Sequence, residues 1–182
     1  MYQERKESER SAFKEKIRDI SIDDLIYMDE SGMDDNEAYE YGYSKKGERC
    51  YGEKVARKRT RTTFIAGYSP SKKALCATFC FEGYTNQEVF LTWIKECLLR
   101  EVFQGKTLVM DNISFHHNQK VKEAIEQSGI NILYLPTYSP DLNPIEKQWA
   151  NLKKKIKLFV ENMSFKRAVE KAFQEMRQPK VI

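Results

Sequence analysis

Three short apolar runs constrain the fold of this 182-residue chain more than any other feature. Each is too short for a buried helix, and none shows the polar alternation of a strand with one wet face. Such runs are typical of strands that are buried on both faces. Both faces of the sheet then need helices, which predicts an α/β layered domain. The runs are Leu25-Ile26-Tyr27-Met28, Leu108-Val109-Met110 and Ile132-Leu133-Tyr134-Leu135.

The stretches between these runs predict the remaining elements. Residues 62–68 and 74–81 are β-branched or aromatic and flank the turn signal Ser69-Pro70, which predicts a hairpin. Apolar residues three and four apart predict helices over 85–98, near 121–125, over 145–159 and from 164 onward, and a short helix within 1–19. We therefore expect a mixed sheet of about five strands with helices on both faces. An antiparallel meander of three strands precedes two helix-linked parallel strands.

Composition excludes several classes of protein. No apolar run approaches the ~18 residues of a membrane span, and the N-terminus lacks the apolar segment of a signal peptide. The four cysteines show no Cys-x-x-Cys spacing, and no cysteine lies near His116 and His117, the two histidines of the chain. These features argue against a membrane protein, a secreted disulfide scaffold and a zinc ribbon. They predict a cytoplasmic protein with reduced thiols.

Charge is distributed unevenly, although the net charge is only +4. Residues 19–40 contain nine acidic residues and no Lys or Arg, whereas residues 45–61 contain eight basic residues and two acidic ones. Residues 147–157 add five lysines and no acid. An acidic patch between basic ones suggests cations held beside a polyanion. Charge runs also occur on ordinary solvated faces, so charge alone leaves both explanations open.

Two of the apolar runs end on a carboxylate, at Asp29 and at Asp111. Ligands bind at the carboxyl ends of strands in open α/β sheets. If the two strands are neighbours, the two carboxylates repel each other, and a divalent cation between them removes that penalty. Oxygen ligands favour Mg²⁺ or Mn²⁺ over zinc. Each residue, taken alone, can equally be an Asp that starts a turn.

Glu146 is the third candidate and has two interpretations. It follows Asn143 by three residues, with Pro144 at the first helical position, so it can complete a capping box. It also lies at the edge of the apolar stripe of its helix, where it can face the rim of the sheet. The loop that follows Leu135 is short, which keeps the start of this helix near the carboxyl edge.

The motifs around these three acids resemble those of the DDE transposases. The motifs are Met-Asp-Glu-Ser-Gly, Met-Asp-Asn-Ile-Ser-Phe-His-His and Tyr-Ser-Pro-Asp-Leu-Asn-Pro-Ile-Glu, with 34 residues between Asp111 and Glu146. The nearest branch is the bacterial insertion-sequence 630 group of the Tc/mariner superfamily. The resemblance covers roughly residues 22–160 and is most specific around residues 135–150.

This resemblance implies a ribonuclease H-like fold in which the first and fourth strands are adjacent. It also implies that Asp29, Asp111 and Glu146 are the catalytic residues and hold two Mg²⁺ ions, for which Mn²⁺ can substitute. The implied activity is cut-and-paste transposition, with DNA cleavage at transposon ends and insertion at TA dinucleotides. Two other functions stay open: another ribonuclease H-fold nuclease or integrase, and a non-catalytic, DNA-binding remnant of a transposase.

The resemblance also guides the expected domains and partners. Residues 1–21 are expected to form an N-terminal helical or linker segment, 22–160 the catalytic domain, and 161–182 a C-terminal helix packed on it. Tc/mariner proteins carry helix-turn-helix modules before the catalytic core, and only about 23 residues precede the first strand here, too few for such a module. We therefore expect a separate DNA-binding subunit or a missing domain, and a homodimer on DNA.

Further residues are candidates for contacts with DNA. Asn112 follows Asp111 and has the alternative role of a turn residue, and His116 has that of a surface residue at a helix start. Glu30 is expected to point away from Asp29, as neighbours on a strand do, and is not a predicted ligand. The candidate DNA contacts are Asn112, His116, Lys45, Lys46, Arg49, Arg57, Lys58, Arg59, Arg61, Lys153 and Lys154.

Overall fold

A computed structural model describes residues 7–35, 44–49 and 59–177 of the chain. Its centre is a five-stranded sheet in the order β3-β2-β1-β4-β5. The pairs β3/β2 and β2/β1 are antiparallel, whereas β1/β4 and β4/β5 are parallel. The strands are β1 Leu25–Asp34, β2 Arg61–Ser69, β3 Ala74–Glu82, β4 Thr107–Met110 and β5 Asn131–Tyr134. The predicted meander, the two parallel strands and the adjacency of first and fourth strands are all confirmed.

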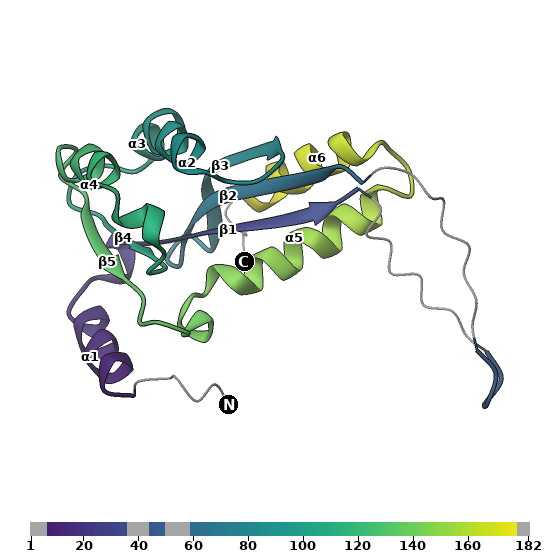
Figure 1. The fold of residues 1–182 in the computed structure, drawn as a ribbon, viewed down its shortest axis with the longest axis horizontal. Helices are drawn as coiled ribbons and strands as arrows, with labels where there is room; N and C mark the ends of the chain where they lie inside the picture. The colour runs from purple at the N-terminus through teal and green to yellow at the C-terminus, as the bar shows by residue number, and fades with distance from the viewer. Residues whose placement is uncertain (1–6, 36–43, 50–58, 178–182) are drawn as a thin grey trace.

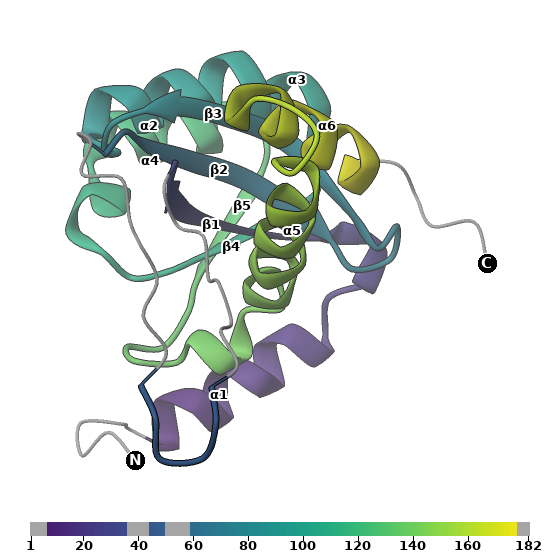
Figure 2. The ribbon, with the colours of Figure 1, turned by 90° about the vertical axis from the view of Figure 1, so that its right-hand side faces the viewer.

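Helices cover both faces of this sheet, as Figures 1 and 2 show. They are α1 Glu7–Arg18, α2 Gln87–Trp93, α3 Leu99–Glu101, α4 Gln119–Glu126, α5 Ile145–Phe159 and α6 Phe165–Arg177. A π-helical turn, η2 Ile94–Leu98, joins α2 to α3. The N-cap of α2 is Asn86, whose side chain accepts a hydrogen bond from the Val89 N–H. No helix of the described segments is long and apolar enough to cross a membrane.

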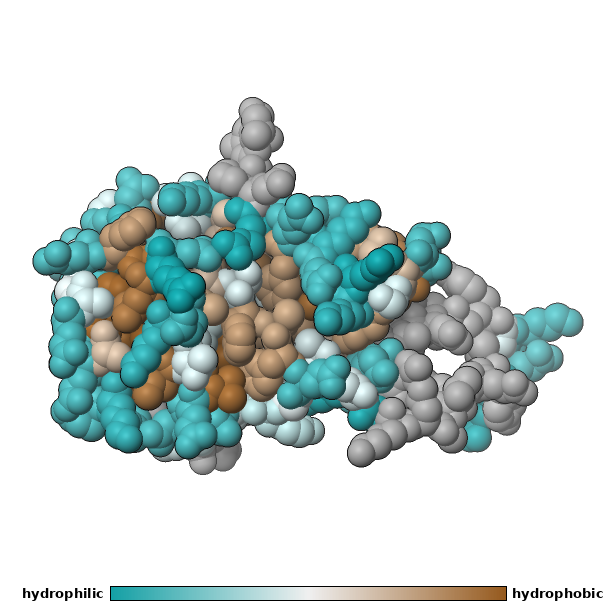
Figure 3. Space-filling view, turned by 90° about the horizontal axis from the view of Figure 1, so that it is seen from above, coloured by the Kyte–Doolittle hydropathy of each residue, from teal (hydrophilic) through white to brown (hydrophobic). Residues whose placement is uncertain are grey.

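Two main cores lie on opposite sides of the sheet because side chains alternate along its strands. Ile26, Met28, Leu108 and Met110 pack with α2, η2 and α4. On the other face, Phe64 and Ala66 of β2 pack with the apolar stripes of α5 and α6. Seen from above, the α2–α3 side carries apolar patches interrupted by hydrophilic side chains (Figure 3). The sheet is therefore buried on both faces, as its apolar runs predicted.

Helix α1 packs on the body of the domain and supports the segment that leads into α5. Phe13 is buried in a third core with Leu25, Val109 and Leu135. Arg10 is 6% exposed and donates two hydrogen bonds, of 3.1 and 2.7 Å, to the carboxylate of Asp141. Asp141 lies in η4 Pro140–Leu142, just before α5. This contact joins the N-terminal segment to the loop that positions Glu146.

Candidate active site at the carboxyl edge of the sheet

The fold brings Asp29 and Asp111 to the same level of two neighbouring strands. The parallel pairing of β1 with β4 runs as far as Tyr27 opposite Val109. Asp29 and Asp111 follow two residues further along their strands. β1 does not end at Asp29, as the sequence suggested, because its other edge stays paired with β2 as far as Asp34. What ends near Asp29 is the pairing with β4, so both carboxylates are at the rim that β1 and β4 share.

Helix α5 is attached to this rim by two side chains. The Asn143 amide donates to the carbonyl of Met28 over 3.3 Å, and the Trp149 indole N–H donates to Oδ2 of Asp29 over 3.0 Å. Glu146 lies one turn before Trp149 in the first turn of α5, and it is exposed. The backbone N–H of Asn143 donates to the carbonyl of Pro140, so Glu146 does not complete the capping box. Its carboxylate is thus left facing solvent at the rim.

The electrostatics of Asp29 show that negative charge is concentrated here. Burial, together with the charges of Glu146 and Glu30, raises the pKa of Asp29 to about 8, although hydrogen bonds from the Glu30 backbone and from Trp149 act in the opposite direction. A carboxyl group with this pKa is mostly protonated at neutral pH unless a cation lies beside it. Asp29 and Glu146 therefore influence each other electrostatically, as members of one site do.

A second group of side chains surrounds Asp111. Nδ1 of His116 lies 2.7 Å from Oδ1 of Asp111 and 3.2 Å from the Asp111 carbonyl oxygen. Nε2 of the same ring lies 3.3 Å from Oε1 of Glu30. His116 belongs to the short helical turn η3 Ser114–His117, which follows β4. Glu30 faces away from Asp29 along β1, as predicted, but that side is occupied by His116.

The prediction that His116 contacts DNA is wrong. Its side chain is 0% exposed, so it offers no surface to DNA and has no surface role at a helix start. Burial lowers the pKa of His116, but its hydrogen bonds with Asp111 and Glu30 outweigh this effect and raise the pKa to about 9. The histidine is therefore a buried residue between two carboxylates, not a surface residue.

The donor atoms fit a hard divalent cation. Oδ1 of Asp111 is shielded from solvent and has no well-directed hydrogen bond, despite the nearby imidazole. The contact of that oxygen with Nδ1 of His116 is close but poorly directed, and the ionised form of Asp29 is disfavoured; a bound cation would relieve both. Asp29, Asp111 and Glu146 offer only oxygen, which Mg²⁺ and Mn²⁺ prefer.

The predicted basic residues are placed unevenly. Lys45, Lys46, Arg49 and Arg59 are exposed, as is Lys154 on α5, whereas Lys153 is half-buried. Arg61 is already engaged, 4.0 Å from Asp34 and 5.2 Å from the ring of Tyr84. Asn112 is exposed and is hydrogen-bonded to His117. Arg57 and Lys58 lie outside the described residues.

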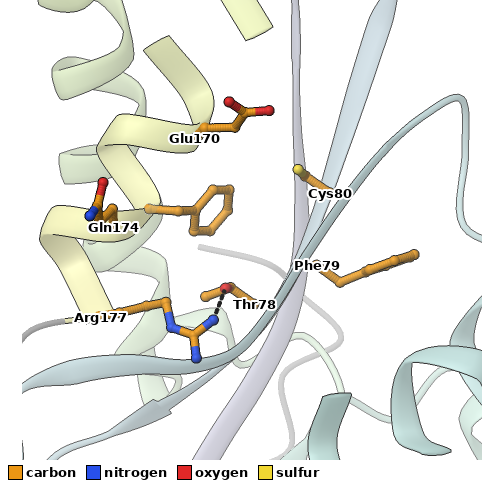
Figure 4. Close-up of a pocket in the computed structure, with 7 residues that line it drawn as sticks. Thr78, Phe79, Cys80, Glu170, Gln174 and Arg177 are labelled. Carbon is orange, nitrogen blue, oxygen red and sulfur yellow. Dashed lines mark hydrogen bonds between the residues drawn. The ribbon is translucent and has the colours of Figure 1, made fainter. Parts of the chain in front are cut away.

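A pocket elsewhere on the surface does not belong to this rim. It has a volume of about 390 Å³ and lies between β3 and α6 (Figure 4). Thr78, Cys80 and Glu170 line it, and a hydrogen bond of 3.1 Å from Arg177 to Thr78 bridges its two walls. Because β3 is at the outer edge of the sheet, the pocket is two strands away from β1 and its acids.

Comparison with known families decides what this arrangement belongs to. The sequence profile of the DDE superfamily endonucleases matches residues 24–169, which include Asp29, Asp111 and Glu146. This chain belongs to that family. A DDE superfamily endonuclease is an enzyme of the polynucleotidyl transferase superfamily, with a catalytic domain of the transposase and integrase type. The family resemblance stated from the motifs is confirmed.

Relatives and solved structures agree with this assignment. The chain is 30% identical over 75 residues to the Tc1 transposase of Caenorhabditis elegans, across 41% of this chain and 28% of that protein. It superposes on the Mos1 strand transfer complex with a TM-score of 0.62 and 13% identity, covering 93% of this chain and 57% of that one. For the catalytic core domain of BIV integrase the TM-score is 0.55, with 12% identity and coverages of 88% and 87%. These likenesses confirm the ribonuclease H-like fold. The chain spans about a quarter of the Tc1 protein and just over half of the Mos1 chain.

Sequence reasoning missed two residues of this site. Trp149 lies in the helix predicted over 145–159 and is not among the candidate site residues, and Glu30 is not a predicted ligand because it points away from Asp29. Trp149 follows Glu146 by three residues and therefore shares its face of the helix, which is a usable signal. For Glu30 the sequence offered no signal, since its contact with His116 spans 86 residues of chain.

Proposed function

We propose that this chain is the catalytic core of a transposase that cleaves DNA at transposon ends and transfers the resulting 3′-hydroxyl into target DNA, at TA sites as the family resemblance implies. One observation carries the proposal. Asp29 and Asp111 are at one level of β1 and β4, and the side chains of Asn143 and Trp149 hold the start of α5 against the same rim. Glu146 is thereby the third carboxylate at this edge.

In this proposal Asp29, Asp111 and Glu146 hold the divalent cations. A pair of Mg²⁺ or Mn²⁺ ions, when bound, supplies Lewis-acid activation of the attacking oxygen and stabilises the leaving oxygen of a phosphodiester. Trp149 keeps the Asp29 carboxylate in place through its indole N–H. The exposed Glu146 is on the solvent side of the rim, where a DNA phosphate can approach. In this arrangement the Asp29 carboxylate is held in place, and the site is open to solvent at Glu146.

DNA is the proposed partner of this rim. The Mos1 structures similar in fold are a strand transfer complex and paired-end complexes with transposon ends. Exposed Lys154 and the exposed cations of residues 45–49 and 59 offer phosphate contacts. If about six such contacts form, the logarithm of the affinity falls with the logarithm of the salt concentration with a slope near −5. A helix-turn-helix subunit or domain and a homodimer on DNA complete the proposal.

The test is strand cleavage by the purified 182-residue chain. The substrate is a duplex that carries the inverted repeats flanking the coding sequence, with Mg²⁺, Mn²⁺ or EDTA. We expect cleavage with either cation, none with EDTA, and a loss of at least about 100-fold in Asp29→Asn, Asp111→Asn and Glu146→Gln. Asp19→Asn, at an exposed acid outside the rim, is the matched control and should cleave normally.

The same assay separates the alternatives. Cleavage of an RNA–DNA hybrid alone would identify another ribonuclease H-fold nuclease. A wild-type protein that binds the duplex but never cuts it, even with Mn²⁺ and its DNA-binding partner, would identify a non-catalytic remnant. Equal cleavage by wild type and all three variants would refute the assignment of the catalytic acids.

A further inference from the structure

The contact that joins the two halves of the rim is made by His116. Glu30 is adjacent to Asp29 in β1, and Asp111 follows β4. The ring of His116 lies between them, with Nδ1 2.7 Å from Asp111 and Nε2 3.3 Å from Glu30. The buried side chain of His116 therefore links β1, which carries the proposed cation ligand Asp29, to Asp111, which is another proposed ligand.

The ring is held in this orientation from several sides. The ring of Phe90, from α2, packs on it with centroids 4.3 Å apart. The hydroxyl of Tyr134 donates to the His116 carbonyl over 3.2 Å, which fixes the backbone of η3 to β5. The side chain of His116 is 0% exposed and that of Glu30 is 15% exposed. Because the imidazole cannot rotate into solvent, its position determines where Oδ1 of Asp111 lies.

The geometry distinguishes a support from a metal ligand. Glu30, Asp111 and His116 present donor atoms within 4.8 Å of one another, a spacing that would also suit an ion. However, each nitrogen of the ring already faces a carboxylate oxygen, one on either side. A ligating imidazole directs one nitrogen at the ion and donates from the other. Here one nitrogen lies 2.7 Å from Oδ1 of Asp111 and the other 3.3 Å from Oε1 of Glu30, as in a bridge between two acids.

We propose that His116 is a positioning residue for Asp111, and that Glu30 fixes the orientation of its ring, so that the pair sets the affinity of the site for divalent cations. This inference rests on the proposed function, in which Asp111 is a cation ligand. Residues that hydrogen-bond to metal ligands orient them, and their loss typically lowers metal affinity about 10–100-fold. In this view the motif Asp-Asn-x-Ser-Phe-His places His116 five residues after the carboxylate that it orients.

Two amide substitutions separate the contacts of the two nitrogens. The side-chain nitrogen of Asn is as many bonds from Cβ as Nδ1 of His, and that of Gln is as many as Nε2. His116→Asn therefore keeps the contact with Asp111, whereas His116→Gln keeps the contact with Glu30. We expect His116→Gln to bind Mn²⁺ about 10–100-fold more weakly than wild type and His116→Asn to lose less than about tenfold. A role limited to filling space predicts the reverse order, since Gln is closer to His in volume.

The readout is Mn²⁺ binding to the full chain, followed by the loss of the free-ion electron paramagnetic resonance signal. His117→Gln is the matched control, because it removes the exposed histidine of the same turn and should change the affinity less than twofold. Equal affinities for wild type and His116→Gln, or a weaker His116→Asn, would overturn the inference. The order of affinities is independent of DNA cleavage. The inference about His116 can therefore be refuted while the cleavage assay confirms the catalytic acids. It can also be supported if the protein cleaves no DNA.

A measurement on protein with His116 intact covers the case in which the substituted proteins do not fold. With ¹⁵N-labelled histidine in the His117→Gln protein, all nitrogen coupling to bound Mn²⁺ comes from His116. A directly coordinated nitrogen would make His116 a ligand and overturn its role as a support. In the same protein, Mg²⁺ should shift the ¹⁵N resonance of Nδ1 more than that of Nε2, since only Nδ1 contacts Asp111. Unchanged resonances at saturating Mg²⁺ would also contradict the proposal.

Discussion

Replacing Asp29 with asparagine should stabilise the protein while abolishing its activity. The carboxyl of Asp29 is buried beside Glu146 and Glu30, and its pKa is raised to about 8, so its ionised form is disfavoured in the folded state. Asparagine has nearly the same shape, carries no charge and still offers an oxygen to the Trp149 N–H. The variant therefore keeps the hydrogen bond from Trp149 and lacks the free-energy penalty of an ionised, buried carboxylate.

The size of the effect follows from the difference in pKa between the two states. Between the unfolded pKa of about 3.9 and the folded pKa, the folded protein holds a proton that the unfolded chain has lost, so stability falls by about 1.4 kcal/mol per pH unit. At pH 7 this amounts to roughly 4 kcal/mol at most. Because Glu146 and Glu30 share the repulsion, we expect about half of that, or roughly 2 kcal/mol, as the gain in Asp29→Asn.

The measurement is urea unfolding in EDTA at pH 4 and pH 7. At pH 4, close to the unfolded pKa of about 3.9, only about half of the unfolded chains have lost the proton, so the gain should shrink to about 0.5 kcal/mol or less, whereas at pH 7 it should be near its full value. Mg²⁺ should stabilise the wild type and leave the variant nearly unchanged. A variant less stable than wild type at pH 7, or a gain that is the same at both pH values, would refute the reasoning.

Asp111→Asn is the informative contrast, since it should have the opposite sign. Asp111 is paired with the buried His116, and Asp111→Asn removes one of the two negative charges that face that ring. We expect a loss of roughly 1–3 kcal/mol. Two acids of one proposed site would then differ in sign because one is crowded by carboxylates and the other faces a histidine. Stabilisation in both variants would show that His116 does not support Asp111.

Three further predictions follow from single contacts. Trp149→Phe keeps an aromatic ring in the core and removes the N–H to Asp29, so DNA cleavage should fall about 10–100-fold in a rate assay with little change in far-UV circular dichroism. Arg10→Ala leaves the partner carboxylate of Asp141 without its two hydrogen bonds, so thermal unfolding should report a loss of roughly 1–3 kcal/mol. Burial raises the pKa of Cys76 to about 12, so its thiol should resist iodoacetamide at pH 8 in the folded protein and react once urea unfolds it, as mass spectrometry would show.

Much of the fold could be predicted because its signals are local. The apolar run 25–28, the turn signal at Ser69-Pro70 and the apolar spacing within 85–98 each act within a few residues, and the structure has the strand, the hairpin and the helix there. The end of β1 could not be predicted. Its extension to Asp34 depends on pairing with β2, some 30 residues away, which no local pattern of polar residues such as Asp29-Glu30-Ser31 reveals.

The acidic residues of the candidate site could be predicted from the sequence, but the residues that hold them in place could not. Asp29 and Asp111 follow apolar runs, and the prediction that they occupy adjacent strands agrees with the β1/β4 pairing. His116, in contrast, was predicted to be a DNA contact or a surface residue at a helix start. Its burial comes from α2, whose Phe90 covers the ring from a different part of the chain. Contacts between layers are decided by packing across the whole fold, and local patterns in a single sequence do not reveal them.

The two faces of the sheet make different contributions to the rim, and this explains why both cores matter for one site. Asp29 is fixed from the side of α5 by Trp149, whose indole belongs to the core shared with α6. Asp111 is fixed from the opposite side by His116, whose ring lies on Phe90 in the core of α2 and η2. Ligands held from two separate layers keep their spacing only if neither layer shifts against the sheet. Cavity-forming substitutions in either core, such as Leu152→Ala or Leu98→Ala, should therefore weaken Mn²⁺ binding even though each lies away from the acids. Affinity that responds to only one of the two cores would show that a single layer holds the site.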